Sequence, residues 1–165
     1  MRQRGFTLIE VLVVLAIGSV LMTSALLTLQ QVVWGTLRAG SQTMALTDVN
    51  FAAASIKEDI EMAQSTNLID GNPVPQSSVT LTWIDYTLFT SATQTHHSSM
   101  YTLSGTKLLR TYDGTVSIVS RHITSIGFTQ NGRVVTVSVT ATGTDVPQRS
   151  KTLNFSMRMR ADGVR

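Results

Sequence analysis

The chain has 165 residues, of which 42% are hydrophobic and 14% charged, and it contains no cysteine. This length allows one modest domain with an anchor but not two full-sized domains, and the composition excludes a highly charged disordered chain. The missing cysteine excludes disulfides, thiol catalysis and cysteine-ligated zinc, and the net charge of +3 is too small to indicate a nucleic-acid-binding protein.

An apolar run extends from Val11 to Leu29, directly after a basic start that contains Arg2 and Arg4. As a helix, a run of this length crosses most of the ~30 Å hydrocarbon core of a bilayer. The preceding arginines predict a cytoplasmic amino terminus and an exported remainder of the chain. Glu10 lies at the start of the run, where a buried carboxylate costs several kcal/mol unless its charge is paired.

Two general interpretations explain only part of this segment. A removed signal peptide has an apolar core of about 7–15 residues and a small-residue cleavage site after it. The present run is longer, and residues 30–34 provide no such site. A plain signal anchor explains the length and the arginines, but it leaves Glu10 unexplained.

Residues 4–13, RGFTLIEVLV, account for every feature of the segment together. They resemble the amino-terminal signature of type IV pilins and of type II secretion pseudopilins. The resemblance implies that a prepilin peptidase cleaves between Gly5 and Phe6 on the cytoplasmic face and N-methylates Phe6. It also implies that Glu10, the fifth mature residue, pairs with the positive amino terminus of a neighbouring subunit.

The resemblance further predicts a structural, non-enzymatic subunit of a type IV pilus or type II secretion pseudopilus, without a cofactor or metal. It implies four partners: the prepilin peptidase, other pilin or pseudopilin subunits, an inner-membrane assembly platform and the lipid bilayer. The head is expected outside the cytoplasmic membrane and, after assembly, in the fibre. The alternative is a single-pass membrane-anchored binding or receptor module with a β-rich extracytoplasmic head.

After Leu29 the chain stays compatible with a helix to about Asn67, and this part is amphipathic. Gly35 and Gly40 weaken the middle of this helix, as a pliable joint or as tolerated surface glycines. The expected buried stripe is Val49, Ala52, Ala53, Ile56, Ile60 and Ala63. The opposite, solvent-facing side is expected to carry Asp48, Lys57, Glu58, Asp59 and Glu61.

Residues 70–75, DGNPVP, predict a turn, and alternating segments typical of strands follow. We expect a strand from residue 79 that continues or restarts over 86–90, a polar loop over 91–99, and hairpins at Gly105 and at Asn131-Gly132. The last strand alternates from Leu153 to Met159. These patterns predict an α+β fold, in which a long amino-terminal hydrophobic helix packs on an antiparallel sheet.

The predicted organisation is a leader peptide (1–5), a transmembrane and assembly helix (6–29), its amphipathic continuation (30–68) and a β-rich head (69–165). Segments over residues 50–160 are loosely similar to minor pseudopilins of the J type and to minor competence pilins. No proline occurs before Pro73, whereas many main-shaft pilins carry one in the membrane half of the helix.

No arrangement of residues predicts catalysis or metal binding. His96 and His97 are expected to be a solvated pair in a polar loop, and the partner of His122 cannot be predicted from the spacing. The carboxyl-terminal region is basic through Arg149, Lys151, Arg158, Arg160 and Arg165. We favour a solvated strand face over contact with nucleic acid or an acidic subunit, because no aromatic residues are interleaved for base stacking.

Overall fold

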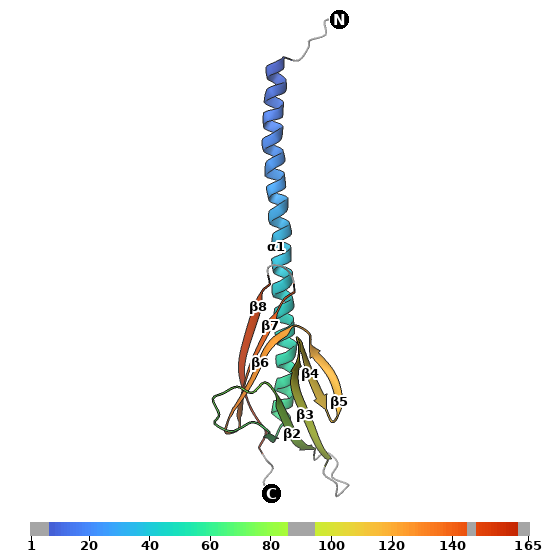
Figure 1. Ribbon diagram of the computed structural model, residues 1–165, viewed down its shortest axis with the longest axis vertical. Coiled ribbons are helices and arrows are strands. Elements are labelled where there is room, and N and C mark those ends of the chain that lie inside the picture. Colours follow the sequence, from blue (N-terminus) through green and yellow to red (C-terminus); the bar gives the residue numbers. More distant parts are fainter. Residues whose placement is uncertain (1–6, 86–94, 145–147, 162–165) are drawn as a thin grey trace.

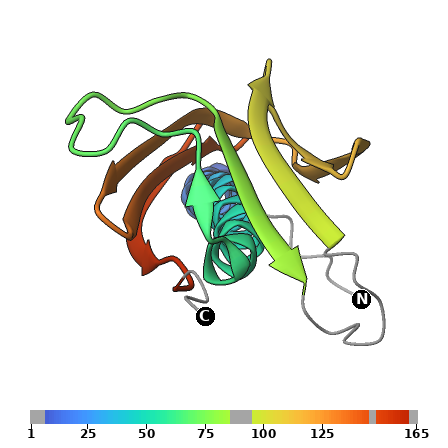
Figure 2. The same cartoon turned by 90° about the horizontal axis from the view of Figure 1, so that it is seen from below.

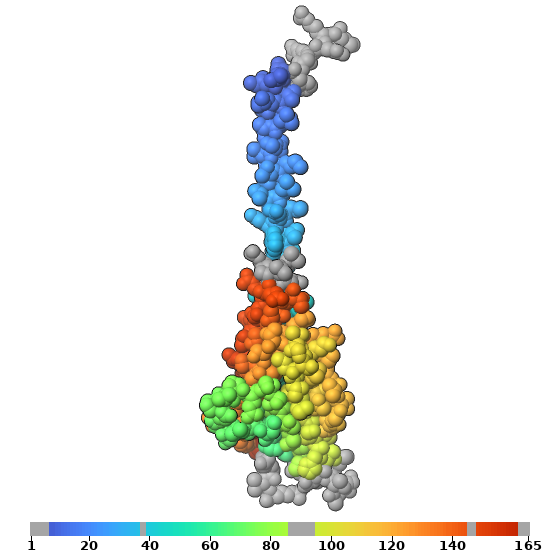
Figure 3. All heavy atoms as spheres, in the orientation of Figure 1, coloured from blue at the N-terminus to red at the C-terminus, as the bar shows by residue number. Residues whose placement is uncertain are grey.

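A single long helix dominates the computed structural model, which describes residues 7–85, 95–144 and 148–161, without the side chains of residues 37 and 38. This helix, α1 (Leu8–Met62), continues through Gly35 and Gly40 without interruption. Its first half stands clear of the remainder, and strands enclose its second half (Figure 1). The space-filling view shows the same division between a bare stalk and a compact head (Figure 3).

Antiparallel strands form two sheets beside α1. One sheet has the order β1-β2-β3-β4-β5 and the other the order β6-β7-β8. Their bounds are β1 (Ser65–Thr66), β2 (Val79–Asp85), β3 (Thr95–Ser104), β4 (Lys107–Tyr112), β5 (Thr115–Ser120), β6 (Ile123–Asn131), β7 (Val134–Thr142) and β8 (Ser150–Arg158). The α+β class and the antiparallel pairing are confirmed, with two sheets in place of one.

The two sheets share the helix as the centre of their core. Seen along its axis, α1 lies between strands of both sheets (Figure 2), and it contacts β2 and β5 of one sheet and β7 and β8 of the other. All six residues of the predicted stripe are buried, from Val49 to Ala63. Ile56 and Ile60 join Leu81, Phe128 and Val137 in one apolar cluster.

A loop between β1 and β2 ties the sheets together. Gln76 and Phe128 of β6 exchange two backbone hydrogen bonds of 2.9 and 2.8 Å, and the Gly71 amide donates to the Gln130 carbonyl. The Asp70 side chain accepts a hydrogen bond from the Gly132 amide in the β6–β7 turn. Gly132 has a positive φ of 58°, as the predicted Asn-Gly hairpin requires.

Two predicted boundaries are wrong. The helix ends at Met62 and not near Asn67, because the amides of Gln64 and Asn67 donate to the carbonyls of Thr82 and Thr80. The predicted loop over residues 91–99 gives way to β3 from Thr95 onward, where His96 and His97 pair with β2. Residues 86–90, where the first strand was expected to continue or restart, lie outside the described residues.

The sheet and the helix approach each other closely where the head begins. A Cβ added to Gly143 would lie 2.3 Å from the carbonyl oxygen of Ser41, which is itself buried. The Gly143 amide donates to the Arg149 carbonyl, and the Arg149 amide donates to the Ser41 hydroxyl at 3.3 Å. Glycine is therefore needed at residue 143 to bring the β7–β8 connection against α1.

Candidate functional site

Glu10 lies in the first turn of α1, and its carboxylate turns back toward the start of the helix. The Thr7 amide and hydroxyl both donate to Glu10 Oε2, at 3.4 and 3.3 Å. This is the arrangement of a capping box, in which an acidic residue three positions into the helix satisfies an amide that has no helical partner. The carboxylate remains exposed, so it also has room for a second, cationic partner.

The remaining predicted processing residues lie outside the part of the chain that the structure describes. They are Arg2, Arg4, Gly5 and Phe6. Thr7, the first described residue, has an extended backbone with ψ of 148°, so the helix begins one residue after it. The predicted cleavage bond therefore precedes the start of α1 by two residues, in a segment amino-terminal to the helix.

The apolar half of α1 has no partner within the described chain. Its most hydrophobic 18-residue window has a mean hydropathy of 2.4 and is wholly exposed, and the helix is long and apolar enough to cross a membrane. Ser19, Thr23, Ser24 and Thr28 each donate a hydroxyl hydrogen bond to a carbonyl one turn earlier, at 2.7–2.9 Å. These hydroxyls are thereby satisfied without water, as a lipid environment requires.

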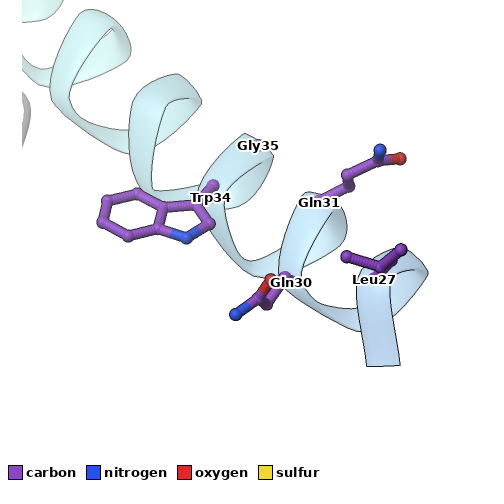
Figure 4. A pocket seen from close by; sticks show the side chains of 5 residues that line it. All are labelled: Leu27, Gln30, Gln31, Trp34 and Gly35. Carbon is purple, nitrogen blue, oxygen red and sulfur yellow. The ribbon is translucent and has the colours of Figure 1, made fainter. Parts of the chain in front are cut away.

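A shallow groove marks the end of the apolar half. It is lined by Leu27, Gln30, Gln31, Trp34 and Gly35 (Figure 4). The side chains of Gln30 and Trp34 lie on the same side of the helix in this view. Tryptophan is enriched where a membrane meets water, because its ring is apolar and its N–H is polar. Trp34 is half exposed and stands between the apolar segment and the head.

In the head, Asp59 lies at the centre of a polar network, although it was expected on the solvent side of α1. It is 1% exposed. Arg110 of β4 forms a bidentate ion pair with it, from Nε at 2.7 Å and Nη2 at 2.6 Å. The hydroxyls of Ser99 and Tyr101 in β3 donate to the same carboxylate, each at 2.6 Å. The expectation for Asp59 is therefore wrong: α1 is covered on this side as well, by the five-stranded sheet.

The pKa values of this network favour the charged pair and a neutral tyrosine. Burial raises the pKa of the Tyr101 hydroxyl far above its usual value of 10, and the hydrogen bond to Asp59 and its negative charge raise it further. Burial opposes the charge on Arg110, but the hydrogen bond and charge of Asp59 outweigh this and raise the arginine pKa. The network therefore links α1 to the five-stranded sheet, and each of its buried side-chain nitrogen and oxygen atoms has a hydrogen-bond partner.

His96 is exposed as expected, but the expectation for His97 is wrong. His97 is partly buried and is not a solvated residue, because its Nδ1 lies 2.6 Å from Asp113 Oδ2 and its ring stacks on Tyr112. His97 and the Ser98 amide lower the pKa of Asp113 by hydrogen bonding. His122 has a partner across the fold, Asp48 of α1, at 2.6 Å. Among the described residues, no group of three or more His, Asp or Glu side chains could hold a metal ion.

The basic residues of the carboxyl-terminal region are divided between the two ends of the head. Arg149 and Lys151 are exposed beside Gln42 and Ala45 of α1, at the end nearest the stalk. Arg158 and Arg160 are exposed at the far end, where the Arg160 amide donates to the carbonyl of Ala63. Arg165 lies outside the described residues. The described basic residues are therefore solvated, as we favoured, and they form two separate groups.

A bare apolar helix that continues into a head folded around its own second half defines a membrane-anchored, pilin-like protein. Residues 1–26 match the family model of the prokaryotic N-terminal methylation motif. This match covers the amino-terminal signature that the first residues predicted, and it supports a type IV pilin-like or pseudopilin subunit, a structural and non-enzymatic class. Neither a curated protein nor a solved structure matches the chain.

Proposed function

We propose that the protein is a subunit, of the minor class, of a type IV pilus or type II secretion pseudopilus. The observation that carries this proposal is the helix itself. Its apolar half is exposed along its whole length, and it bears a single carboxylate, Glu10, in its first turn. The missing proline in this half and the loose similarity to J-type pseudopilins support the minor class.

In this proposal, prepilin peptidase removes residues 1–5 and methylates Phe6. The bond lies in a segment that precedes α1, so the mature chain keeps its membrane helix. Gly5→Leu is expected to block cleavage, because a side chain before the bond occupies space that the protease needs. Intact-mass measurement of membrane-extracted protein, from cells with an active peptidase, tests this. A chain that retains Met1, or normal processing of Gly5→Leu, would contradict the proposed site.

Glu10 is proposed to meet the amino terminus of a neighbouring subunit in the low-dielectric centre of the fibre. Its contact with Thr7 allows the charge to be tested separately from the helix start. Glu10→Gln keeps the acceptor oxygen that a capping box needs but removes the charge. Processed Glu10→Gln protein is expected to accumulate in membranes and to be depleted from sheared fibres, while Glu10→Ala loses both functions.

The competing class is a membrane-anchored receptor, which predicts an uncut amino terminus and indifference to Glu10. Equal incorporation of wild type and Glu10→Gln into fibres would refute the pairing. An uncut wild-type chain in the presence of the peptidase would favour the receptor.

A further inference from the structure

A second group of residues, unrelated to processing, lies between the stalk and the head. Arg149, Ser150 and Lys151 line a hollow with Gln42 and Ala45 of α1. Both basic side chains are exposed, and the described lining residues include no carboxylate. The backbone here is held in place, because the Arg149 amide donates to the Ser41 hydroxyl and the Arg149 carbonyl accepts from Gly143.

The hollow lies on the same side of α1 as the groove around Trp34. Leu27, Trp34 and Ala45 are separated by seven and eleven residues, which are about two and three turns of an α-helix. One side of the molecule therefore carries, in order, apolar side chains of α1, a tryptophan with a neighbouring glutamine (Figure 4), and two cations at the start of β8. This is the order of polarity across one leaflet of a membrane, from hydrocarbon through the ester region to the phosphate layer.

The distances along the helix agree with this order. Trp34 and Gln42 are eight residues apart, or about 12 Å, and a headgroup layer is about 5–7 Å thick. The distance that remains between the headgroup layer and the level of Gln42 is within the reach of a long basic side chain. It is also within the screening length of about 8 Å at physiological salt.

The length of the apolar run agrees with this placement. If Glu10 stays at the cytoplasmic interface, Val11–Leu29 spans about 28 Å, close to the ~30 Å hydrocarbon core. Residues 30–34 then lie in the interface, with Trp34 at the level where tryptophan is enriched. A modest tilt toward the side with Trp34, within the range that membrane helices adopt, brings Arg149 and Lys151 closer to the headgroups.

We propose that Arg149 and Lys151 bind the headgroup phosphate of an anionic phospholipid in the outer leaflet before the subunit enters a fibre. The occupant is a lipid because Trp34 and the apolar segment continue the same face into the bilayer. The inference rests on the membrane insertion in the proposed function but does not depend on cleavage.

The experiment uses the full chain in nanodiscs that contain equal amounts of phosphatidylglycerol and phosphatidylcholine. Native mass spectrometry after release from the disc counts the lipids that the protein retains. Arg149→Gln/Lys151→Gln is compared with Arg158→Gln/Arg160→Gln, which removes the same charge at the far end of the head. Intact mass from the same spectra shows whether residues 1–5 are present, so a failure of processing is read separately.

Wild type and the control variant are expected to retain phosphatidylglycerol about 30-fold over phosphatidylcholine, from two basic groups at the surface. The Arg149→Gln/Lys151→Gln variant is expected to lose this preference. Equal retention of both lipids by wild type, or an equal loss in both variants, would overturn the proposal. Displacement of the retained lipid by about 10 mM inorganic phosphate, a concentration that screens exposed charges only weakly, would also overturn it, because the site would then bind free anions.

Discussion

Removal of Arg110 is expected to be the most damaging single change in the head. Arg110→Leu leaves the Asp59 carboxylate 1% exposed and without its cation, with only the hydroxyls of Ser99 and Tyr101 as donors. Breaking a buried ion pair in this way costs about 3–5 kcal/mol. Because the Arg110 side chain is 28% exposed and water screens part of the interaction, we expect the lower end, about 3 kcal/mol.

For a head of about 120 residues, a loss of 3 kcal/mol lowers the melting temperature by about 12 °C. The assay is thermal unfolding of the full chain in detergent, followed by near-ultraviolet circular dichroism to isolate the head. The matched control is the double variant Asp59→Leu/Arg110→Leu, which removes both charges. This variant is expected to recover part of the lost stability, because an apolar pair replaces the ion pair at little net cost but leaves the buried hydroxyls of Ser99 and Tyr101 without their acceptor.

Two outcomes would refute the reasoning about Arg110. A decrease below about 1 kcal/mol in Arg110→Leu would show that the pair behaves as a surface salt bridge. A double variant more unstable than Arg110→Leu would show that the unpaired charge of Asp59 is not the main source of the loss.

Three further predictions concern packing and pH. Gly143→Ala places a Cβ 2.3 Å from the Ser41 carbonyl and should destabilise the head by about 1–3 kcal/mol. The control Gly35→Ala meets open space and should stabilise α1 by up to about 1 kcal/mol. Equal melting temperatures for these two variants would contradict the close approach at Gly143. Since the folded pKa of Tyr101 is raised, its contribution to stability is complete below its unfolded pKa of about 10 and declines as pH rises above it; urea titrations should show a shallower alkaline decline in Tyr101→Phe. The folded pKa of Asp113 is lowered, so its contribution to stability is complete above about pH 3.9 and is lost as pH falls through the folded pKa. Asp113→Asn should therefore reduce the loss of stability at acid pH in the same urea titrations. An unchanged acid dependence would argue against the pair with His97.

The features that depend on local sequence patterns could be predicted from the sequence. The buried stripe from Val49 to Ala63 and the hairpin at Asn131-Gly132 follow from local periodicity and turn chemistry, which need no knowledge of the tertiary fold. The amino-terminal signature is equally local, since ten consecutive residues carry it.

The polar contacts across the fold could not be predicted in the same way. Asp59 and Arg110 are 51 residues apart, and Asp48 and His122 are 74 apart. On a helical wheel, Asp59 falls within about 40° of Ala52 and Ala63, at the edge of the buried stripe, so its position indicated burial although its charge favoured the solvent side. The sequence did contain one indication of this network. Ser99 and Tyr101 lie on β3 and Arg110 lies on β4, and these two strands pair with each other. Polar side chains on an inward face of a sheet need a buried hydrogen-bond acceptor.

The uninterrupted helix through Gly35 and Gly40 has a mechanical consequence. Because the head is folded on α1 itself, from Ser41 onward, the stalk and head share one rotational axis. Each residue inserted or deleted between Leu29 and Ser41 changes the height of the head by only about 1.5 Å but turns it by about 100°. The length of this connecting segment therefore determines which side of the head faces a neighbour, and a four-residue insertion, which nearly restores the original angle, should be tolerated better than a two-residue insertion.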